Sequence, residues 1–139
     1  MSVVLDASQT IAWLFEDEAD DAAMMLLRKV GAEGAMVPGL WRLEIANVLR
    51  NAAIRGRCDD DYVDESLSRL ARLPIECDDE TDSHAWTGTL ALAREEHLTL
   101  YDAAYLELAL RKGLPLASRD KELVSAAKRR GLEVVGAVA

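Results

Sequence analysis

Short apolar runs alternate along the chain with longer stretches in which apolar residues recur at helical spacing. Short runs of up to eight apolar residues, often β-branched, are typical of buried strands. Apolar residues at the spacing i, i+3, i+4 predict helices. Five strands are predicted, at residues 3–5, 35–37, 75–77, 114–117 and 133–135. The predicted helices cover residues 8–15, 22–30, 41–56, 59–73, 79–96, 101–112 and 119–130.

Polar residues, glycines and prolines mark where these elements begin and end. Ser8 is expected to cap the first helix, and the acidic cluster of residues 16–21 to form a turn before the second. Gly31 is expected to end that second helix. An interruption is expected in the helix of residues 79–96, near Thr87 and Gly88.

The alternation of strands and helices predicts an α/β fold. A parallel sheet covered by helices on both faces, with right-handed crossovers, is the usual result of such a pattern. Ligands of these sheets gather at the carboxyl ends of the strands, where the strand order reverses. The length of 139 residues is close to the commonest domain size, so residues 1–139 are expected to form one domain.

Composition is that of an ordinary folded protein, with 50% hydrophobic and 29% charged residues. The first residues, MSVVLDAS, lack the features of a secretion signal, and no window resembles a membrane span. A cytoplasmic protein that makes no membrane contact is therefore expected. Cys58 and Cys77 lack metal-ligand spacing and are expected to be free thiols, and His84 and His97 are expected at the surface or at helix ends.

The net charge of -9 argues against nonspecific binding of nucleic acid, which usually needs a basic surface. The charge is unevenly distributed: residues 1–83 contain 18 acidic and 8 basic side chains, and residues 84–139 contain 7 and 8. A local basic rim is compatible with this distribution. The acidic half could also accept a basic partner peptide.

Four carboxylates stand apart from the acidic runs, because each lies inside an apolar stripe or at the end of a predicted element. Asp6 ends the first strand, and Glu44 lies within the apolar stripe of its helix. Asp102 and Asp120 lie at the starts of two later helices. Each position also has a purely structural explanation: a helix cap for Asp6, Asp102 and Asp120, and a favourable interaction with the helix dipole for Glu44.

The case for function depends on the four acids lying together. If the strand order reverses between the first and fourth strands, the ends of those strands meet and the acids share one cleft. Two like charges 4 Å apart repel by roughly 4 kcal/mol at an effective dielectric constant of 20, so such a group raises its own pKa values or binds cations. Mg²⁺ or Mn²⁺ takes oxygen ligands and, when bound to phosphate, activates water for hydrolysis of a phosphodiester.

Several segments resemble the PIN-domain family, and within it the VapC-type toxins of VapBC toxin-antitoxin systems. These are LDAS near the start, VPGLWRLEIANVL, and LTLYDAAYLELALRKGLPLASRDKEL, followed by a short final strand. The resemblance covers nearly the whole chain. It implies a three-layer α/β/α sandwich with a parallel five-stranded sheet, and a metal-dependent endoribonuclease.

The resemblance also implies roles for individual residues. Asp6 and Asp102 would be the principal ligands of Mg²⁺ or Mn²⁺, and Glu44 and Asp120 would complete the acidic pocket directly or through waters. Ser8 and Ser118 would lie behind the ligands or contact the scissile phosphate; many relatives have Thr at position 118. Asn47, one turn beyond Glu44, is a further pocket candidate, although an ordinary exposed Asn explains that position equally well.

An antitoxin of the VapB type, an RNA substrate and a homodimer are the partners that the resemblance implies. Apolar surface near Trp13 and Tyr62 is a candidate partner groove, with core packing as the simpler explanation.

Other function classes fit the sequence less well. A haloacid-dehalogenase-type phosphatase needs a second Asp where Ser8 stands, a receiver domain needs adjacent acids after the first strand, and no glycine-rich nucleotide motif follows that strand. The remaining alternative is a PIN-like module that binds RNA or protein without cleaving it.

Overall fold

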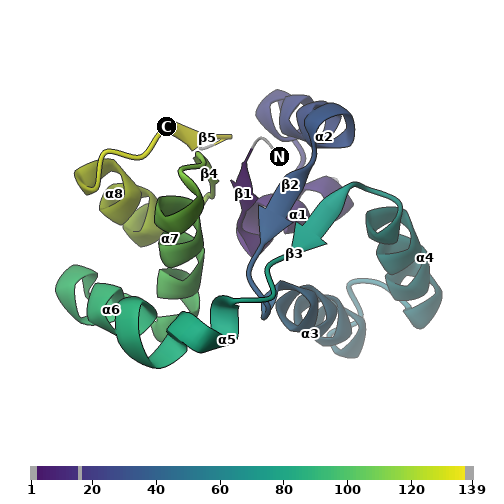
Figure 1. Cartoon of the computed structure of the whole chain (residues 1–139). Helices are drawn as coiled ribbons and strands as arrows, with labels where there is room; N and C mark the ends of the chain where they lie inside the picture. The colour runs from purple at the N-terminus through teal and green to yellow at the C-terminus, as the bar shows by residue number, and fades with distance from the viewer. Residues whose placement is uncertain (1–2, 16, 137–139) are drawn as a thin grey trace.

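The protein is built on one sheet of five parallel strands (Figure 1). The computed structural model describes residues 3–15 and 17–136. The strands are β1 (Val4–Leu5), β2 (Ala35–Val37), β3 (Ile75–Cys77), β4 (Leu116–Ala117) and β5 (Val134–Val135). Their order in the sheet is β3-β2-β1-β4-β5, and every neighbouring pair is parallel. The predicted α/β class and all five predicted strands are confirmed.

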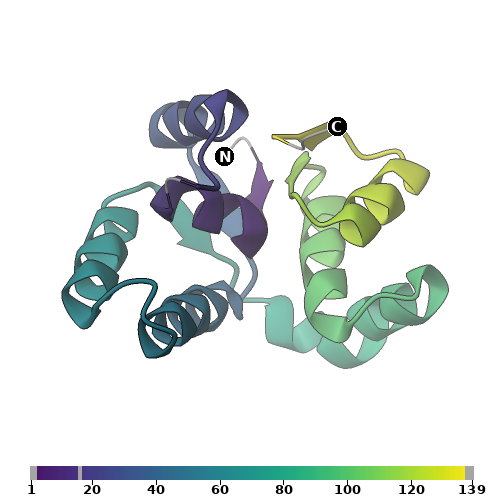
Figure 2. The ribbon, with the colours of Figure 1, turned by 180° about the vertical axis from the view of Figure 1, so that it is seen from behind.

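Helices cover both faces of the sheet, as the alternation of elements predicts. They are α1 (Ala7–Leu14), α2 (Asp21–Glu33), α3 (Trp41–Ile54), α4 (Asp60–Ala71), α5 (Thr81–His84), the π-helical segment η1 (Ala85–Thr89), α6 (Leu90–Glu96), α7 (Leu100–Lys112) and α8 (Lys121–Arg129). Helices α5, α6 and α7 lie on the side that faces the viewer in Figure 1, and α1 and α8 on the side that faces the viewer in Figure 2. This is the expected three-layer arrangement.

The strand order reverses beside β1, where the sequence analysis places the cleft. From β1 the chain proceeds to β2 and β3 on one side, and β4 and β5 lie on the other side. Leu5 pairs with Ala117, and the backbone N–H of Asp6 donates to the carbonyl of Ala117 at 2.9 Å. The residues that follow β1 and β4 therefore start from adjacent points of the sheet edge.

Apolar residues of β1 and β4 form the centre of the core, which explains why these strands read as continuous hydrophobic runs. Val4, Leu5, Leu116 and Ala117 are fully buried. The edge strand β3 is partly exposed. Within the described residues, no helix combines the length and the apolar character that a membrane span requires.

Two predicted helix boundaries are wrong. The second helix continues through Gly31 to Glu33, and the chain leaves it at Gly34, whose φ of 81° belongs to the left-handed region that favours glycine. Gly31 only lowers the helix propensity, so packing of the helix against the core overrides it. Ser8 does not cap α1, because the helix begins at Ala7 with Asp6 at the N-cap position.

Other predicted boundaries are confirmed. The helix of residues 79–96 is interrupted by the π-helical segment η1, which contains Thr87 and Gly88. Asp20, in the predicted acidic turn, caps α2 by accepting from the N–H of Ala23 at 2.8 Å; Glu16 of that turn lies outside the described residues. His97 ends α6 in the left-handed conformation, a helix-end role as expected.

Trp13 and Tyr62, beside which the candidate partner groove was expected, lie at the margin of the core, and Tyr62 lines a surface pocket with Phe15 and Arg57. Both side chains are partly buried against the core. The Tyr62 hydroxyl donates to the carbonyl of Leu14, and its ring lies 6.0 Å from that of Phe15. These contacts agree with core packing, and the partner groove stays a prediction.

Candidate functional site

Asp6 is the buried acid at the end of β1. Only 5% of its surface is exposed, and its Oδ2 atom accepts hydrogen bonds from the hydroxyls of Ser8 at 2.7 Å and Ser118 at 2.8 Å. Burial raises the pKa of Asp6, and these two hydroxyls partly offset that rise. The protein thus holds a carboxylate where its charge is costly.

Ser8 and Ser118 connect the two chain segments that leave the sheet at this edge. Ser8 accepts from the backbone N–H of Arg119 at 3.0 Å, and Ser118 accepts from that of Asp120 at 3.0 Å. Each hydroxyl therefore receives a backbone N–H and donates its own proton to Asp6. Both serines are therefore in direct contact with the same oxygen of Asp6.

Glu44 comes from the first turn of α3 and is half-buried. Its Oε1 atom accepts a hydrogen bond of 2.5 Å from the hydroxyl of Tyr105, a fully buried residue of α7. Burial raises the pKa of Glu44, and the charges of Asp6 and Asp102 raise it further. Glu44 does lie near the positive end of the α3 dipole, as the structural explanation requires. That explanation does not account for the burial of its carboxylate beside Asp6 and Asp102.

The contact with Tyr105 was missed by the sequence analysis. Tyr105 stands three residues after Asp102, so both lie on one face of α7. A phenol within a stripe of alanine and leucine was the available signal, because a buried Tyr hydroxyl usually needs a polar partner. Nothing in the sequence alone indicates that this partner is Glu44, 61 residues away.

Asp102 lies in the first turn of α7 but does not cap it. Thr99 is the capping residue, and its hydroxyl accepts from the backbone N–H of Asp102 at 3.1 Å. Burial, followed by the charges of Asp120 and Asp6, raises the pKa of Asp102 to about 6. The capping alternative for Asp102 is therefore wrong, and its carboxylate lies within the field of two other acids.

Asp120 does cap a helix, which confirms the structural explanation that the sequence analysis gives for this residue. Its Oδ1 atom accepts from the backbone N–H of Leu123 at 2.9 Å at the start of α8. Its charge nevertheless raises the pKa of both Asp102 and Asp6. Asp120 combines a structural role with a place beside the other acids.

The charges of Asp6, Asp102 and Asp120 each raise the pKa of at least one other acid of the four, although the acids come from four different elements or loops. In the described part of the chain, no three of the four bring one oxygen each within 4.8 Å of one another. Among the residues that the structure describes, no Lys, Arg or His forms an ion pair with any of them. Their oxygens are the hard ligands that Mg²⁺ and Mn²⁺ prefer. The donor set and its uncompensated charge therefore fit a divalent cation.

Asn47 is exposed on α3, one turn beyond Glu44. In the described part of the chain, no hydrogen bond connects its side chain to the four acids. Its position agrees with an ordinary exposed Asn as well as with a residue at the rim of the site.

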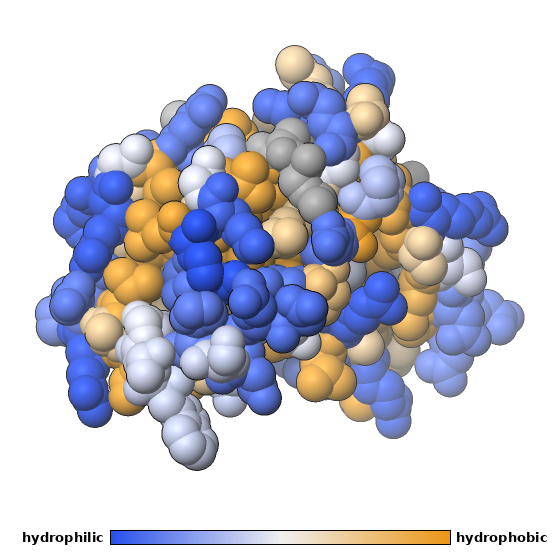
Figure 3. All heavy atoms as spheres, viewed as in Figure 1, coloured by the Kyte–Doolittle hydropathy of each residue, from blue (hydrophilic) through white to orange (hydrophobic). Residues whose placement is uncertain are grey.

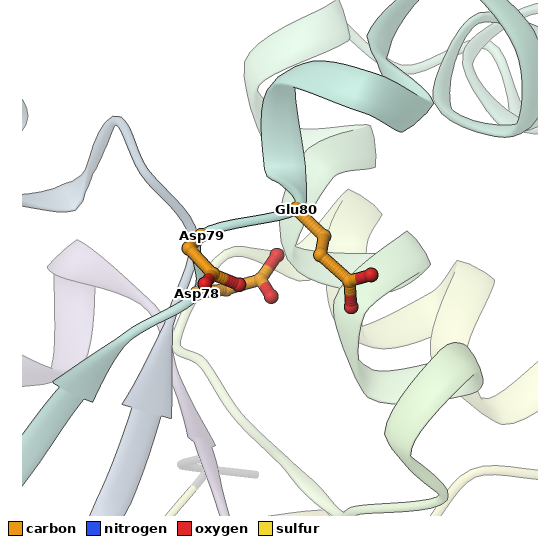
Figure 4. Close-up of side chains that lie close together, drawn as sticks. All are labelled: Asp78, Asp79 and Glu80. Atoms are coloured by element: carbon orange, nitrogen blue, oxygen red, sulfur yellow. The ribbon is translucent and has the colours of Figure 1, made fainter.

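A second acidic group, Asp78, Asp79 and Glu80, follows β3 (Figure 4). Its carboxylate oxygens lie within 4.8 Å of one another, a spacing that could hold an ion. Hydrophilic side chains dominate the surface over this loop and α5 in Figure 3. The order β3-β2-β1 separates this group from Asp6 by one intervening strand.

Arg111 of α7 pairs with two members of this second group, Asp78 and Glu80, and so offsets part of its charge. Its guanidinium contacts Asp78 Oδ2 at 2.6 Å, Glu80 Oε2 at 3.3 Å and Glu107 Oε2 at 2.8 Å. Burial opposes the charge of Asp78, but hydrogen bonds from Arg111 and Thr81 hold its pKa below the usual value. A group compensated in this way has less need of a metal ion than the four acids beside β1.

Three solved structures share this fold. PAE2754 from Pyrobaculum aerophilum is 27% identical, with a TM-score of 0.67 over 97% of this chain and 91% of that one. VapBC2 from Rickettsia felis, bound to a DNA fragment from its promoter, is 12% identical, with a TM-score of 0.67 over all of both chains. VapC20 from Mycobacterium tuberculosis, a toxin that cleaves the sarcin-ricin loop, is 16% identical, with a TM-score of 0.61 over 90% of this chain and 95% of that one.

Sequence comparison gives the family directly. No curated protein sequence matches the chain. The family model for the PIN domain matches residues 3–129, which includes all four acids and both serines. The chain therefore belongs to the PIN-domain family.

Proposed function

We propose that the protein is an endoribonuclease that depends on Mg²⁺ or Mn²⁺, and that it is the toxin of a VapBC toxin-antitoxin pair. Residues 1–139 form one PIN domain in this proposal, with Asp6, Glu44, Asp102 and Asp120 as the metal and catalytic residues. The observation that carries it is the concentration of four acids, without a compensating side-chain cation in the described chain, at the edge where the strand order reverses. Cytoplasmic RNA is the proposed substrate.

A bound divalent cation supplies Lewis acidity, which polarises the scissile phosphate and lowers the pKa of an attacking water. It also offsets part of the negative charge of the acids and provides a positive centre, so that a phosphate of a polyanion can approach an acidic chain. This explains how a protein of net charge -9 could act on RNA.

Hydrogen bonds within the chain orient the carboxylates of the proposed metal site before an ion binds. Two serine hydroxyls fix one oxygen of Asp6, and Tyr105 fixes one oxygen of Glu44. Because the acids already have their orientations, little reorganisation is needed when charge develops on the phosphate. Asp102, with a pKa of about 6, would be largely ionised at neutral pH and available as a ligand.

The solved structures and the charge distribution support the proposed partners. The structure of VapBC2 holds a pair bound to a DNA fragment from their promoter, and VapC20 is described as a toxin that cleaves the sarcin-ricin loop. Residues 1–83 hold 18 acids against 8 bases, which suits a basic segment of a VapB-type antitoxin. A homodimer belongs to the same proposal. A short open reading frame for a small DNA-binding protein immediately upstream of the gene would support the antitoxin.

Cleavage of RNA by the purified chain is the direct test. Transfer, ribosomal and messenger RNAs are incubated separately with the chain and Mg²⁺ or Mn²⁺, and with Asp6→Asn and Asp102→Asn variants. Loss of either ligand should lower the cleavage rate by more than about a hundredfold, since even groups that only support metal ligands contribute about 10–100-fold. Asp64→Asn, on the exposed face of α4, is the matched control and should cleave like the wild type.

Equal cleavage by the wild type and both site variants would mean that a contaminating nuclease is responsible, and the assignment would be withdrawn. If none of the RNAs is cleaved but RNA is bound, the alternative of a noncleaving PIN-like module would replace it.

A further inference from the structure

Donors within the chain occupy one oxygen on each of three acids in the proposed metal site. Asp6 Oδ2 accepts from two serine hydroxyls, at 2.7 and 2.8 Å. Glu44 Oε1 accepts from the Tyr105 hydroxyl at 2.5 Å, and Asp120 Oδ1 accepts from the N–H of Leu123 at 2.9 Å. The second oxygen of each carboxylate accepts none of these hydrogen bonds.

We infer that these donors make Asp6, Glu44 and Asp120 single-oxygen ligands, so that the site selects Mg²⁺ or Mn²⁺ against Ca²⁺, and that Tyr105 determines this selectivity at Glu44. The inference rests on the proposed metal site and extends it from the presence of an ion to the choice of ion. Tyr105 contacts no ion itself and is a positioning residue.

The physical basis is the different coordination of the two kinds of ion. Ca²⁺ takes six to eight oxygens at 2.3–2.6 Å, often from carboxylates that bind through both oxygens, whereas Mg²⁺ takes six at 2.0–2.1 Å in a strict octahedron. An oxygen that accepts a short hydrogen bond has less negative charge to offer an ion. Turning both oxygens toward one ion would also stretch that hydrogen bond. A set of single-oxygen ligands therefore disfavours Ca²⁺.

Tyr105 is the donor whose removal should matter most. Its ring is fully buried in α7, so water cannot readily replace the hydroxyl if it is removed. It restrains the longest and most flexible of the four acidic side chains, because Glu has one more rotatable bond than Asp. It also connects α3 to α7 one turn beyond Asp102, which fixes the distance between two ligand-bearing helices.

Binding of metal ions to the purified chain tests the inference without any measurement of cleavage. Affinities of Mg²⁺, Mn²⁺ and Ca²⁺ are measured by isothermal titration calorimetry for the wild type and for Tyr105→Phe. The wild type should bind Mn²⁺ and Mg²⁺ more tightly than Ca²⁺. Tyr105→Phe should shift the ratio of Ca²⁺ to Mg²⁺ affinity by about tenfold toward Ca²⁺, the lower end of what groups behind metal ligands contribute.

Tyr62→Phe is the matched control, because it also removes a hydroxyl that donates a hydrogen bond, to the carbonyl of Leu14 in a different part of the protein. Its affinity ratio should equal that of the wild type. Ser118→Ala, which removes one donor to Asp6 Oδ2, provides a second variant and should shift the ratio in the same direction if Tyr105→Phe fails to fold.

The outcomes separate the inference from the function on which it rests. An unchanged ratio in a folded Tyr105→Phe, or in Ser118→Ala where only that variant folds, overturns the inference and leaves the metal site standing. Wild-type protein that binds no divalent ion overturns both. Wild-type protein that prefers Ca²⁺ overturns the inference alone.

Discussion

Asp102 carries the clearest sign, among single residues, of a site built for a cation. Its pKa of about 6 lies well above the usual value of 3.8, mainly because of burial and then because of Asp120 and Asp6. The folded, metal-free protein thus binds this proton more tightly than the unfolded chain. Its contribution to stability is unfavourable above about pH 6 and is relieved as the pH falls through that value.

Replacing Asp102 by Asn should therefore raise the melting temperature of the metal-free protein at pH 7.5 and lose roughly half of that gain at pH 5, which lies between the folded-state pKa of about 6 and the usual value of 3.8. The variant lacks the charge that the other acids repel, and protonation removes the same charge from the wild type. The measurement is thermal unfolding in the presence of a chelator at both pH values, with Asp64→Asn as the exposed control. A gain that is the same at both pH values would show that the charge of Asp102 is not the cause.

Residue-level prediction from the sequence succeeded where a charge interrupted an apolar pattern. The four acids stood out for that reason, and their mutual effects on pKa were expected from the topology. Tyr105 was missed because its partner lies 61 residues away, and Asp120 was correctly interpreted as a helix cap. Hydrogen bonds between distant segments depend on tertiary structure, which a local pattern does not contain.

At the scale of single elements, the first turn of α7 contributes both to the stability of the helix and to the proposed metal site. Thr99 caps this helix by accepting from the N–H of Asp102, so the cap and a proposed ligand share one turn. Asp59 caps α4 in the same way, because its Oδ1 atom accepts from the backbone N–H of Tyr62 at 2.8 Å. This cap lies away from the four acids.

Thr99→Ala and Asp59→Ala should each lower the free energy of unfolding by about 1 kcal/mol, the usual cost of losing a cap. Only Thr99→Ala should also weaken Mn²⁺ binding, because only that cap orients Asp102. Urea denaturation and calorimetry measure the two effects. Weaker Mn²⁺ binding in Asp59→Ala as well would mean that loss of stability alone explains the change.

Most helices and all strands were predicted because the apolar period was strong in each of them. The errors fell at boundaries, where tertiary packing decides. Gly31 did not end α2, and Ser8 lies within the first turn of α1, where its hydroxyl donates to Asp6.

At the scale of the whole molecule, Arg111 connects the loop after β3 to α7. The side chains of Asp78 and Glu107 are 2% and 9% exposed, so both charges depend on this guanidinium. Sequence analysis gave no role to either contact: Arg111 and Asp78 are 33 residues apart, whereas the pair of Glu107 and Arg111 stands at i,i+4 spacing and was overlooked.

Arg111→Met should lower the free energy of unfolding by roughly 3 kcal/mol, since it leaves buried carboxylates without a partner. Arg57→Met removes ion pairs with the exposed Asp17 and Glu18 and should cost much less. Chemical denaturation compares the two. Equal losses would show that burial does not set the strength of the Arg111 network.

The fold also allows a direct test of the claim that the four acids bind the metal ion, because the location of a bound ion can be measured. Two acidic groups lie at the carboxyl edge: the four acids around β1 and β4, and the Arg111-bound group after β3. Anomalous scattering from a crystal grown with Mn²⁺ locates the ion directly. The predicted peak lies among Asp6, Glu44, Asp102 and Asp120; a peak at Asp78, Asp79 and Glu80 with none at the four acids would contradict the account.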